Sequence, residues 1–510
     1  MKISAISSQV LLIILDGFGI RDESLKNAIH AAKTPNIDRY FSEYPFTTIT
    51  PGGELVGLPK GVAGNSEVGH MNLGAGRPVR QDLVRINEAV SNNSLKDLPK
   101  FQELIDKTKK GTGRVHLMGL LSDGGVHSHI DHIKHLIPLL ADEGLDIFFH
   151  AYMDGRDTSK TSGEKYITEL LQTTGFVFAS MQGRSIGMDR DRRWQKIEHA
   201  YKTLCGSGDI TDKSPVDYLK SEYENENFDE FITPVLFGSR KNAIQDGDSV
   251  FFINFRPDRA RQITLAMMDP QFSEFERNIT PGYFLCMTPY VEEEIDLPIL
   301  FNKEKIKGTL SEYLSRLGKK QLKIAETEKY AHVTYFFNGG ERKPFDGESQ
   351  ILVPSPKDVA TYDLKPEMSA KEVTTKLNIE LQNRDYSFYL VNFANSDMVG
   401  HTGNYEAAVK AIEILDEQVD KIVKTALDNN ISILITSDHG NSDQMIYEDG
   451  SPHTSHSSAN SPFCLIAKDI SKENVKINEG EFALKDVAPT ILYLLGIEIP
   501  PEFTGKPIFS

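Results

Sequence analysis

In the segment Ile431-Ser-Ile-Leu-Ile-Thr-Ser-Asp438-His439-Gly-Asn441, an apolar run ends in a polar turn. Short, β-branched runs followed by glycine-containing turns are typical of buried strands. Phe388–Phe393 has the same form and precedes Asp397, and Val10–Leu15 precedes Asp16. Ligands of an open α/β sheet bind at the carboxyl ends of its strands. We therefore predict a sheet whose carboxyl edge collects carboxylates and imidazoles from both ends of the chain.

Candidate metal ligands follow each of these strands, and a further His-Thr-Ser-His segment adds two imidazoles. They are Asp16, Asp397, His401, Asp438, His439, His453 and His456. Such oxygen and nitrogen donors suit Mn²⁺ or Zn²⁺, and the set is too large for one ion but right for two. Taken singly, an Asp after a strand is commonly a helix cap or turn former, and a single His is commonly a surface group. Their coincidence at three strand ends favours a two-metal phosphoryl-transfer centre.

A candidate nucleophile lies in the segment Gly61-Val-Ala-Gly-Asn-Ser66-Glu67. Glycine and asparagine before the serine permit the strained backbone that aims a hydroxyl into a cleft. Metal coordination can activate a serine, and neither a Gly-x-Ser-x-Gly elbow nor a serine-hydrolase order of His and Asp is evident. The alternative is that Ser66 caps a helix that Glu67 opens. The local sequence leaves both interpretations open.

The composition limits the class of protein. A chain of 510 residues is long enough for more than one hydrophobic core. Its formal net charge of −17 argues against nucleic acid or an anionic membrane as the main partner. No apolar run approaches the ~18 residues of a membrane span, and three widely spaced cysteines predict neither a disulfide framework nor a zinc site. We expect a cytoplasmic monomer that binds a small molecule.

The spacing of the metal set predicts an insertion. Because Asp16 lies near one end and the other ligands follow residue 396, one sheet must be built from both ends of the chain. The middle of the chain has its own alternation of strand-like and helix-like segments, which is typical of βα units. The strand-like segments are 114–121, 146–152 and 249–255, and the helical ones are 130–141 and 163–171. We place the domains at 1–80 with 308–510, and at 81–307.

The C-terminal half has a helical signal between two of the predicted strands. Apolar residues recur every three or four positions from Val409 to Ala426, which predicts an amphipathic helix. A helix between two buried strands indicates a parallel crossover.

The inserted segment concentrates arginines in short polar motifs. Guanidinium groups match phosphate and carboxylate oxygens two at a time. The candidates, with the polar residues beside them, are Arg156, Asp157, Arg184, Arg190, Arg256 and Arg259. Surface ion pairs with the interleaved aspartates are the alternative for each single arginine. Collectively, in an acidic chain, they fit a small dianionic or trianionic substrate.

A histidine-rich segment, Ser122–His135, suggests a third metal site. No carboxylate or thiol set completes a ligand shell there, so we do not predict one. His127 follows a pair of glycines and precedes the predicted helix, where it could donate a hydrogen bond to substrate. We expect His132 and His135 to lie on the helix surface.

Taken together, these segments resemble the cofactor-independent phosphoglycerate mutase family of the alkaline phosphatase-like superfamily. The resemblance runs nearly from end to end. The matching segments are Leu15-Asp-Gly-Phe-Gly19, Gly64-Asn-Ser-Glu-Val-Gly-His70, Asp154-Gly-Arg-Asp-Thr158, Asn254-Phe-Arg-Pro-Asp-Arg259, Glu326-Thr-Glu-Lys-Tyr-Ala-His332 and the three metal motifs. The resemblance implies a three-layer α/β/α phosphatase-like domain that binds metal, with a second α/β domain inserted in it that binds substrate.

The resemblance also implies roles for single residues. One Mn²⁺ would be held by Asp397, His401 and His456, and the other by Asp16, Ser66, Asp438 and His439. His453 would have a supporting role at most. Lys329 would reach the phosphoryl group. The phosphoglycerate would be held by His127, Arg156, Asp157, Arg184, Arg190, Arg256 and Arg259.

The implied activity is the interconversion of 3-phosphoglycerate and 2-phosphoglycerate in glycolysis and gluconeogenesis, without bisphosphoglycerate. Ser66 would form a phosphoserine intermediate, and Asp157 is the candidate base for the second hydroxyl. Such an isomerase must exclude water during transfer, so we expect the two domains to close over the ligand. The enzymatic alternative is a metal-dependent phosphatase, sulfatase or phosphopentomutase. A phosphometabolite-binding relic is disfavoured, because such a protein would have lost the nucleophile or a ligand.

Overall fold

The computed structural model describes residues 8–21, 26–291, 294–303 and 305–510. The chain forms two compact units, one built from residues 1–81 and 305–510 and the other from residues 82–304. Each unit contains one seven-stranded sheet. The second sheet is therefore formed wholly by chain inserted between the two parts of the first unit, and the predicted α/β class with an inserted α/β domain is confirmed.

The sheet of the first unit brings the two ends of the chain together. Its five leading strands are parallel, and the last two are antiparallel to their neighbours. In spatial order they are β11 (Glu348–Val353), β10 (Gln321–Glu326), β12 (Phe388–Phe393), β1 (Val10–Leu15), β13 (Ser432–Thr436), β14 (Ser461–Ile466) and β2 (Phe46–Ile49). The N-terminal strand β1 thus lies between β12 and β13.

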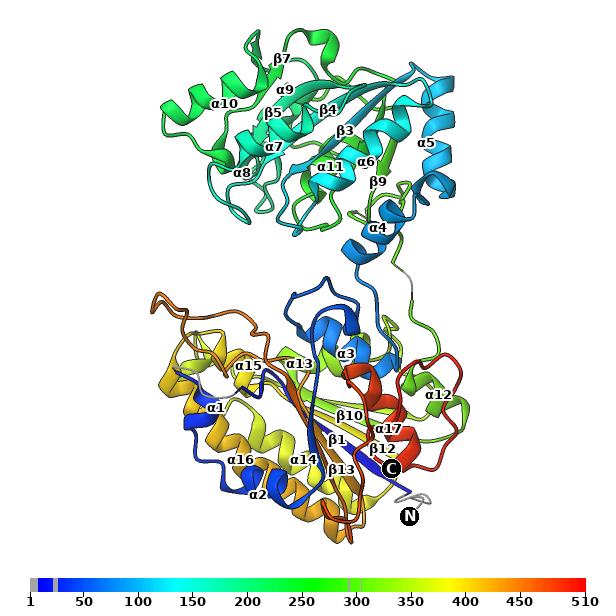
Figure 1. Ribbon diagram of the computed structural model, residues 1–510, viewed down its shortest axis with the longest axis vertical. Coiled ribbons are helices and arrows are strands. Elements are labelled where there is room, and N and C mark those ends of the chain that lie inside the picture. Colours follow the sequence, from blue (N-terminus) through cyan, green and yellow to red (C-terminus); the bar gives the residue numbers. More distant parts are fainter. Residues whose placement is uncertain (1–7, 22–25, 292–293, 304) are drawn as a thin grey trace. The chain divides into compact units, whose positions relative to one another are not determined.

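Helices cover both faces of this sheet. Every residue of β1 is fully buried, with alternate side chains packing into cores on opposite faces, so a continuous apolar run replaces the alternating pattern of a one-sided strand. Figure 1 shows α14 and α16 on one side and α12 and α17 on the other. The helices are α1 (Ala28–Ala31), α2 (Pro35–Glu43), α3 (Ser66–Ala75), α12 (Leu310–Arg316), α13 (Thr327–Ala331), α14 (Ala370–Asn383), α15 (Asn395–Gly400), α16 (Tyr405–Asp428) and α17 (Val487–Leu494). This is the predicted three-layer arrangement.

Helix α16 is the predicted amphipathic helix. The side chain of Asn404 caps its first turn by accepting a hydrogen bond from the Ala407 amide. Its apolar face, from Ile412 to Ala426, is buried against the sheet. The helix joins two parallel strands, as expected, but β1 separates them in the sheet.

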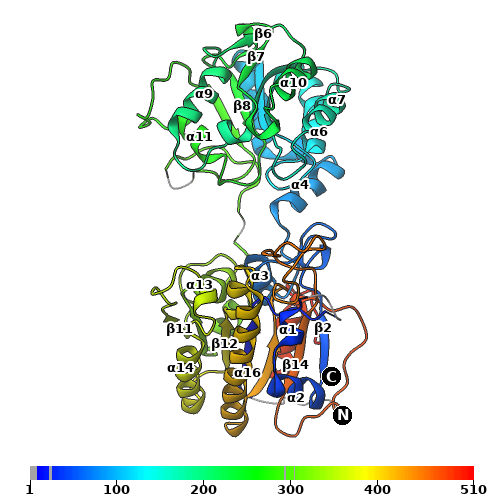
Figure 2. The ribbon, with the colours of Figure 1, turned by 90° about the vertical axis from the view of Figure 1, so that its left-hand side faces the viewer.

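The inserted unit has the same layered construction. Figure 2 shows α9 and α11 on one side of its sheet and α6 and α7 on the other. In spatial order the strands are β6 (Ile210–Thr211), β7 (Val235–Phe237), β5 (Val177–Gly183), β4 (Asp146–Met153), β3 (Arg114–Leu121), β8 (Ser249–Phe252) and β9 (Tyr283–Cys286). Only the β5–β7 pair is antiparallel among the described residues. The helices are α4 (Asp82–Ser91), α5 (Pro99–Lys110), α6 (Ile130–Ala141), α7 (Gly163–Leu170), α8 (Arg184–Gly187), α9 (Trp194–Leu204), α10 (Pro215–Glu224) and α11 (Arg261–Met268).

Two details of the inserted unit differ from expectation. The strand predicted to reach residue 255 ends at Phe252, and the chain then leaves the sheet toward Arg256. His132 is not on the helix surface: it is 1% exposed and hydrogen-bonds through Nε2 to Asn87 Oδ1. The apolar face of α6 is broad enough to include it, because α4 packs over that face. Within the described residues, no helix is both long and apolar enough to cross a bilayer.

Candidate metal centre and arginine cluster

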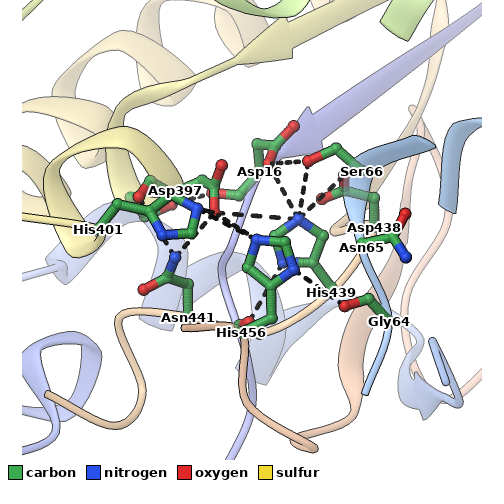
Figure 3. A network of polar contacts seen from close by, with 12 residues as sticks. Asp16, Gly64, Asn65, Ser66, Asp397, His401, Asp438, His439, Asn441 and His456 are labelled. Atoms are coloured by element: carbon green, nitrogen blue, oxygen red, sulfur yellow. Dashed lines mark hydrogen bonds and ion pairs between the residues drawn. The ribbon is translucent and has the colours of Figure 1, made fainter. Parts of the chain in front are cut away.

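The carboxyl edge of the first sheet carries the predicted metal ligands. Asp16 directly follows β1, Asp397 lies on α15 immediately after β12, and Asp438 follows β13. All three carboxylates are at most 2% exposed. Figure 3 shows these side chains turned toward one another, with those of Ser66, His401, His439 and His456. Parallel strands produce this convergence, because they all end at the same edge.

Asp397 is the centre of one group of donors. Its Oδ1 lies 3.1 Å from His401 Nε2 and 3.4 Å from His456 Nε2. The two imidazole nitrogens are 3.1 Å apart. Both rings turn Nδ1 away toward backbone carbonyls, at Thr454 for His401 and Gly64 for His456, which leaves each Nε2 facing Asp397. A metal ligand commonly binds a carbonyl through its second ring nitrogen in this way.

A second group of donors surrounds the Ser66 hydroxyl. Ser66 Oγ lies 3.3 Å from Asp16 Oδ1 and 2.9 Å from His439 Nε2. The same His439 nitrogen is 3.5 Å from Asp438 Oδ2. The four predicted ligands of the second ion therefore lie together, beside the first group.

Ser66 is the first residue of α3 and not its cap. The cap is Asn65, whose side chain accepts a hydrogen bond from the Val68 amide at 3.0 Å. The alternative interpretation of Ser66 as a capping serine is therefore wrong. Gly64, just before the cap, has no room for a side chain, because a Cβ atom would lie 2.4 Å from the carbonyl of Pro51. This close approach fixes the turn that brings the hydroxyl to the predicted metal ligands.

Lys329, on α13, supplies a positive charge to the same cluster. Its Nζ lies 2.8 Å from Asp16 Oδ1, 2.8 Å from Ser66 Oγ and 2.6 Å from Asp397 Oδ2. Burial by itself would lower the pKa of Lys329, but Asp16 and Asp397 raise it above its ordinary value. Conversely, burial would raise the pKa of Asp16, but the Lys329 ammonium holds it below its usual range.

The donor set fits a divalent metal. Burial would lower the pKa of His439, but Asp438 and the other carboxylates raise it to about 9, so the site has a strongly negative potential. Both carboxylate oxygens of Asp438 are fully buried without a hydrogen-bond partner among the described residues. An uncompensated buried carboxylate is costly unless a cation binds it. Two sets of donors converge closely enough for one ion each: Asp397, His439 and His456, and Asp16, His70 and Asp438.

These two sets divide the residues differently from the expected ligand shells, since His439 takes the place of His401 beside Asp397, and His70 takes the place of His439 beside Asp16. His70 ends the Gly64–His70 motif but was not predicted to lie at the site. Asn441, which donates to Asp397 Oδ1 at 2.8 Å, and Asn392 were also missed. From sequence alone, an Asn at a strand end that hydrogen-bonds to a metal ligand cannot be distinguished from an Asn that stabilises a turn.

The predicted substrate residues lie together in the inserted unit. Arg190 and Arg256 both bind Asp258, at 2.8 and 3.1 Å, and His127 Nδ1 lies 3.9 Å from the same carboxylate. Arg259 Nη1 donates to the Met188 carbonyl at 3.1 Å. Burial and the positive charges of Arg184, Arg190 and Arg156 lower the pKa of Arg259.

Arg184 and Asp157 form a second part of this cluster. Arg184 is 1% exposed, and its Nη1 lies 2.5 Å from both Asp154 Oδ1 and Asp157 Oδ2. Its Nε is buried without a hydrogen-bond partner among the described residues. Arg156 is half-exposed, with Nη1 3.6 Å from Glu230. The arginines do form ion pairs with neighbouring aspartates, as the alternative interpretation expects. These pairs lie within one cluster, however, and leave guanidinium nitrogens available to bind an anion.

His127 is held as a neutral imidazole. Burial and the positive charge of Arg184 lower its pKa to about 4. Asp154 and Asp258, which hold the arginines, were not predicted. Both lie inside the arginine motifs. In sequence, however, an Asp that holds a substrate-binding arginine in place looks the same as an Asp that forms a surface ion pair.

Comparison with known proteins agrees with this arrangement. The family model described as the metalloenzyme superfamily matches residues 8–499. The chain is 46% identical over 511 residues to the 2,3-bisphosphoglycerate-independent phosphoglycerate mutase of Clostridium novyi (strain NT), covering 98% of this chain and 99% of the relative. It is 47% identical over 514 residues to the protein of the same name from Ectopseudomonas mendocina (strain ymp), covering 99% of each.

A solved structure is also similar over nearly the whole length. It is a crystal structure of Leishmania mexicana phosphoglycerate mutase at low cobalt concentration, with a TM-score of 0.67 and 30% identity. The similarity covers 98% of this chain and 97% of that one. The chain belongs to the 2,3-bisphosphoglycerate-independent phosphoglycerate mutase family, within the metalloenzyme superfamily.

Proposed function

We propose that this protein interconverts 3-phosphoglycerate and 2-phosphoglycerate by moving the phosphoryl group through Ser66, without bisphosphoglycerate. The observation that carries the proposal is the surroundings of the Ser66 hydroxyl. Within 3.3 Å it meets a carboxylate of Asp16, an imidazole of His439 and the ammonium of Lys329. A buried hydroxyl with an acceptor for its proton and a cation for the incoming phosphoryl oxygens is equipped for nucleophilic attack on phosphorus.

Two divalent ions, Mn²⁺ by preference, are the proposed cofactors. Asp397, His401 and His456 would hold one, and Asp16, Ser66, Asp438 and His439 the other. Bound there, the ions would lower the pKa of the Ser66 hydroxyl and offset charge on the transferring oxygens. Oxygen and imidazole donors without thiolate are consistent with Mn²⁺.

The residues of the chain itself contribute binding and proton transfer. Lys329 places its ammonium beside Ser66 and would hold a phosphoryl oxygen. The arginine cluster, Arg156, Arg184, Arg190, Arg256 and Arg259, would bind the glycerate carboxylate and phosphate, with His127 as a hydrogen-bond partner. Asp157 would accept the proton of the hydroxyl that receives the phosphoryl group.

The choice of a mutase over a phosphatase depends on what receives the phosphoryl group from Ser66. A phosphatase passes it to water, whereas a mutase returns it to the bound glycerate. The arginine cluster gives the glycerate a binding site of its own, which supports retention of that molecule. The three cysteines are free thiols, which fits a reducing compartment, and we propose a cytoplasmic monomer.

A coupled assay tests the function. Purified protein with Mn²⁺ and 3-phosphoglycerate, but no bisphosphoglycerate, is expected to produce 2-phosphoglycerate, detected with enolase. Ser66→Ala is expected to abolish conversion, and Ser91→Ala, which alters an exposed serine at the end of α4, is the matched control. Release of inorganic phosphate without 2-phosphoglycerate would overturn the mutase proposal. Conversion by Ser66→Ala would overturn transfer through the serine.

A further inference from the structure

Two buried residues outside the proposed ligand set connect three of its members. His70 lies one helical turn after Ser66 on α3, and Asn392 lies on β12 beside β1. Both side chains are 0% exposed. Asn392 Nδ2 is 2.8 Å from Asp16 Oδ2 and 3.0 Å from His70 Nε2.

The contact with Asp16 fixes which way the Asn392 amide faces. A carboxylate oxygen only accepts hydrogen bonds, so the amide must present its nitrogen to Asp16. The flipped amide would place two acceptors 2.8 Å apart. The orientation therefore follows from the chemistry of the partner, and not from an arbitrary choice between oxygen and nitrogen.

The amide orientation in turn fixes the tautomer of His70. Because Asn392 Nδ2 can only donate, His70 Nε2 must accept, and the ring proton is on Nδ1. Nδ1 lies 2.8 Å from the carbonyl oxygen of Ser66 and 3.2 Å from Asp438 Oδ2. The Nδ1–H thus donates to the backbone carbonyl of Ser66, and its positive end also lies near the Asp438 carboxylate, which has no hydrogen-bond partner among the described residues.

The result is a continuous connection in which Asn392 donates to both Asp16 and His70, and His70 donates in turn to the backbone carbonyl of Ser66. It begins at Asp16, passes through Asn392 and His70, and ends at Ser66 and Asp438. These three end points belong to one proposed metal site. In the described residues, neither Asn392 nor His70 hydrogen-bonds to Asp397, His401 or His456, which belong to the other.

We infer that Asn392 and His70 are positioning residues for the metal site that contains Ser66, and that they set the affinity of this site separately from the other. The inference rests on the proposed function for the assignment of the two sites. The physical reason is pre-organisation: Asp16, Ser66 and Asp438 come from β1, α3 and the turn after β13, and a rigid link between them removes the cost of gathering them around an ion. Loss of such outer hydrogen bonds typically weakens metal binding by about 10–100-fold.

A purely structural role would have a different consequence. Breaking a buried polar network destabilises the fold as a whole, so the affinity of both sites would fall together. A positioning role weakens one site and leaves the other unchanged. The discriminating quantity is therefore the affinity of each site, and not the activity.

Three substitutions each remove a different hydrogen bond of this connection. His70→Asn keeps a donor near the Nδ1 position and loses the acceptor for Asn392. His70→Gln keeps an acceptor near the Nε2 position and loses the donor to Ser66. Asn392→Ala removes the link to Asp16. His332→Gln is the matched control, because that ring lies 5.4 Å from His70 and has no hydrogen bond to a proposed ligand among the described residues.

The measurement is Mn²⁺ binding to metal-free full-length protein by calorimetry, with metal content confirmed by elemental analysis. Two binding sites are expected in the parent, and each His70 or Asn392 variant is expected to weaken one by about 10–100-fold. His332→Gln should bind as the parent does. In a His456→Ala background, which disables the other site, His70→Gln should reduce binding of the remaining ion by the same factor.

Unchanged affinities in all three variants, or equal weakening of both sites, would overturn the inference. Circular dichroism of the metal-free variants establishes that they are folded, and any variant that is not folded is replaced by the remaining two. The outcome is separable from the proposed function. A parent that binds two ions without mutase activity refutes the function, while selective weakening of one site in its variants would still support the positioning role.

Discussion

Lys329 Nζ donates a hydrogen bond to the hydroxyl of Ser66 over 2.8 Å, while Asp16 and Asp397 flank the same ammonium at 2.8 and 2.6 Å. The lysine is 3% exposed, so its charge acts with little screening by water. The two carboxylates keep it protonated, because they raise the pKa of Lys329 against the effect of burial. A fixed positive charge therefore lies beside the proposed nucleophile, where it would meet a phosphoryl group.

Lys329→Met should remove this charge while retaining much of the side chain's volume. We expect kcat to fall by about 10²–10³-fold, the usual loss when a pre-organised electrostatic contact is removed from an active site. The coupled assay measures the rate, and calorimetry measures Mn²⁺ binding. Metal binding should persist, because all seven proposed ligands are intact. A variant with parental kcat would refute a role for Lys329 in phosphoryl transfer.

Metal removal should abolish activity and lower stability. The three buried carboxylates Asp16, Asp397 and Asp438 repel one another, and a bound cation stabilises only the folded form. Ions at 100 times their dissociation constant would raise the free energy of unfolding by about 2.7 kcal/mol per site. Thermal unfolding with chelator and after addition of Mn²⁺ measures the shift. Equal melting temperatures in the two conditions would contradict the metal site.

We expect Asp154→Ala to impair substrate use, although Asp154 is not proposed to contact the substrate itself. Asp154 accepts hydrogen bonds from Ser122 Oγ and from the backbone amides of Arg156 and Asp157, and it pairs with Arg184. Because these contacts fix the loop after β4, their loss should lower kcat/KM by about 10²-fold through misplacement of binding groups.

The control for this prediction is Asp123→Ala. Asp123 is exposed and pairs with the exposed Lys165, so its loss should leave kcat/KM near the parental value. Circular dichroism separates misplacement from unfolding. Equal kinetics for the two variants would show that Asp154 does not organise the loop.

Asp248→Ala should destabilise the inserted unit. Its carboxylate accepts from Thr112, Arg114, His116 and the Gln245 amide at 2.7–3.0 Å, and it is fully buried. Removing one partner of a buried charged pair typically costs about 3–5 kcal/mol. Urea unfolding measures the loss. A change below about 1 kcal/mol, the size expected of a surface pair, would contradict this account.

His132 predicts a dependence of stability on pH. Burial, together with the charges of His129 and His135, lowers its pKa to about 3, whereas the unfolded value is about 6.5. Between these values the unfolded chain binds more protons than the folded one, so stability falls as the pH falls below 6.5. The slope from this one group is at most about 1.4 kcal/mol per pH unit.

His132→Gln should flatten that slope, because glutamine can still donate to Asn87 and does not titrate. Unfolding in urea at several pH values between 4.5 and 7 compares the variant with the parent. The difference in unfolding free energy between them should shift in favour of the variant as the pH falls. Parallel curves would show that His132 is not protonated on unfolding.

Much of the fold could be predicted from local sequence. Continuous apolar runs such as Val10–Leu15 specify strands buried on both faces, and the three-four spacing of α16 specifies a helix. The end of β8 at Phe252 and the burial of His132 could not be predicted from local sequence, because both depend on which elements pack beside them. Hydrophobic periodicity indicates which face of a helix or strand is buried, but not how much of its surface the neighbouring elements cover.

The candidate site was predictable where chemistry leaves few options. Carboxylates and imidazoles after strands indicate a metal site, and arginines grouped in short motifs indicate an anionic substrate. Asp154, Asp258, His70 and Asn392 were missed because their residue types are common in turns and caps. Their roles become clear only from the residues to which they hydrogen-bond in the folded protein.

The layered α/β architecture and the residue types of the site follow from the amino-acid sequence alone, because strand and helix periodicity and ligand chemistry are local properties. The position of β1 between β12 and β13, and the link that Asn392 makes from Asp16 to His70, become visible only in the folded chain. The physical reason is sequence separation: Asp16 and Asn392 are 376 residues apart, and no local rule records a contact that forms when distant strands share one edge of a sheet.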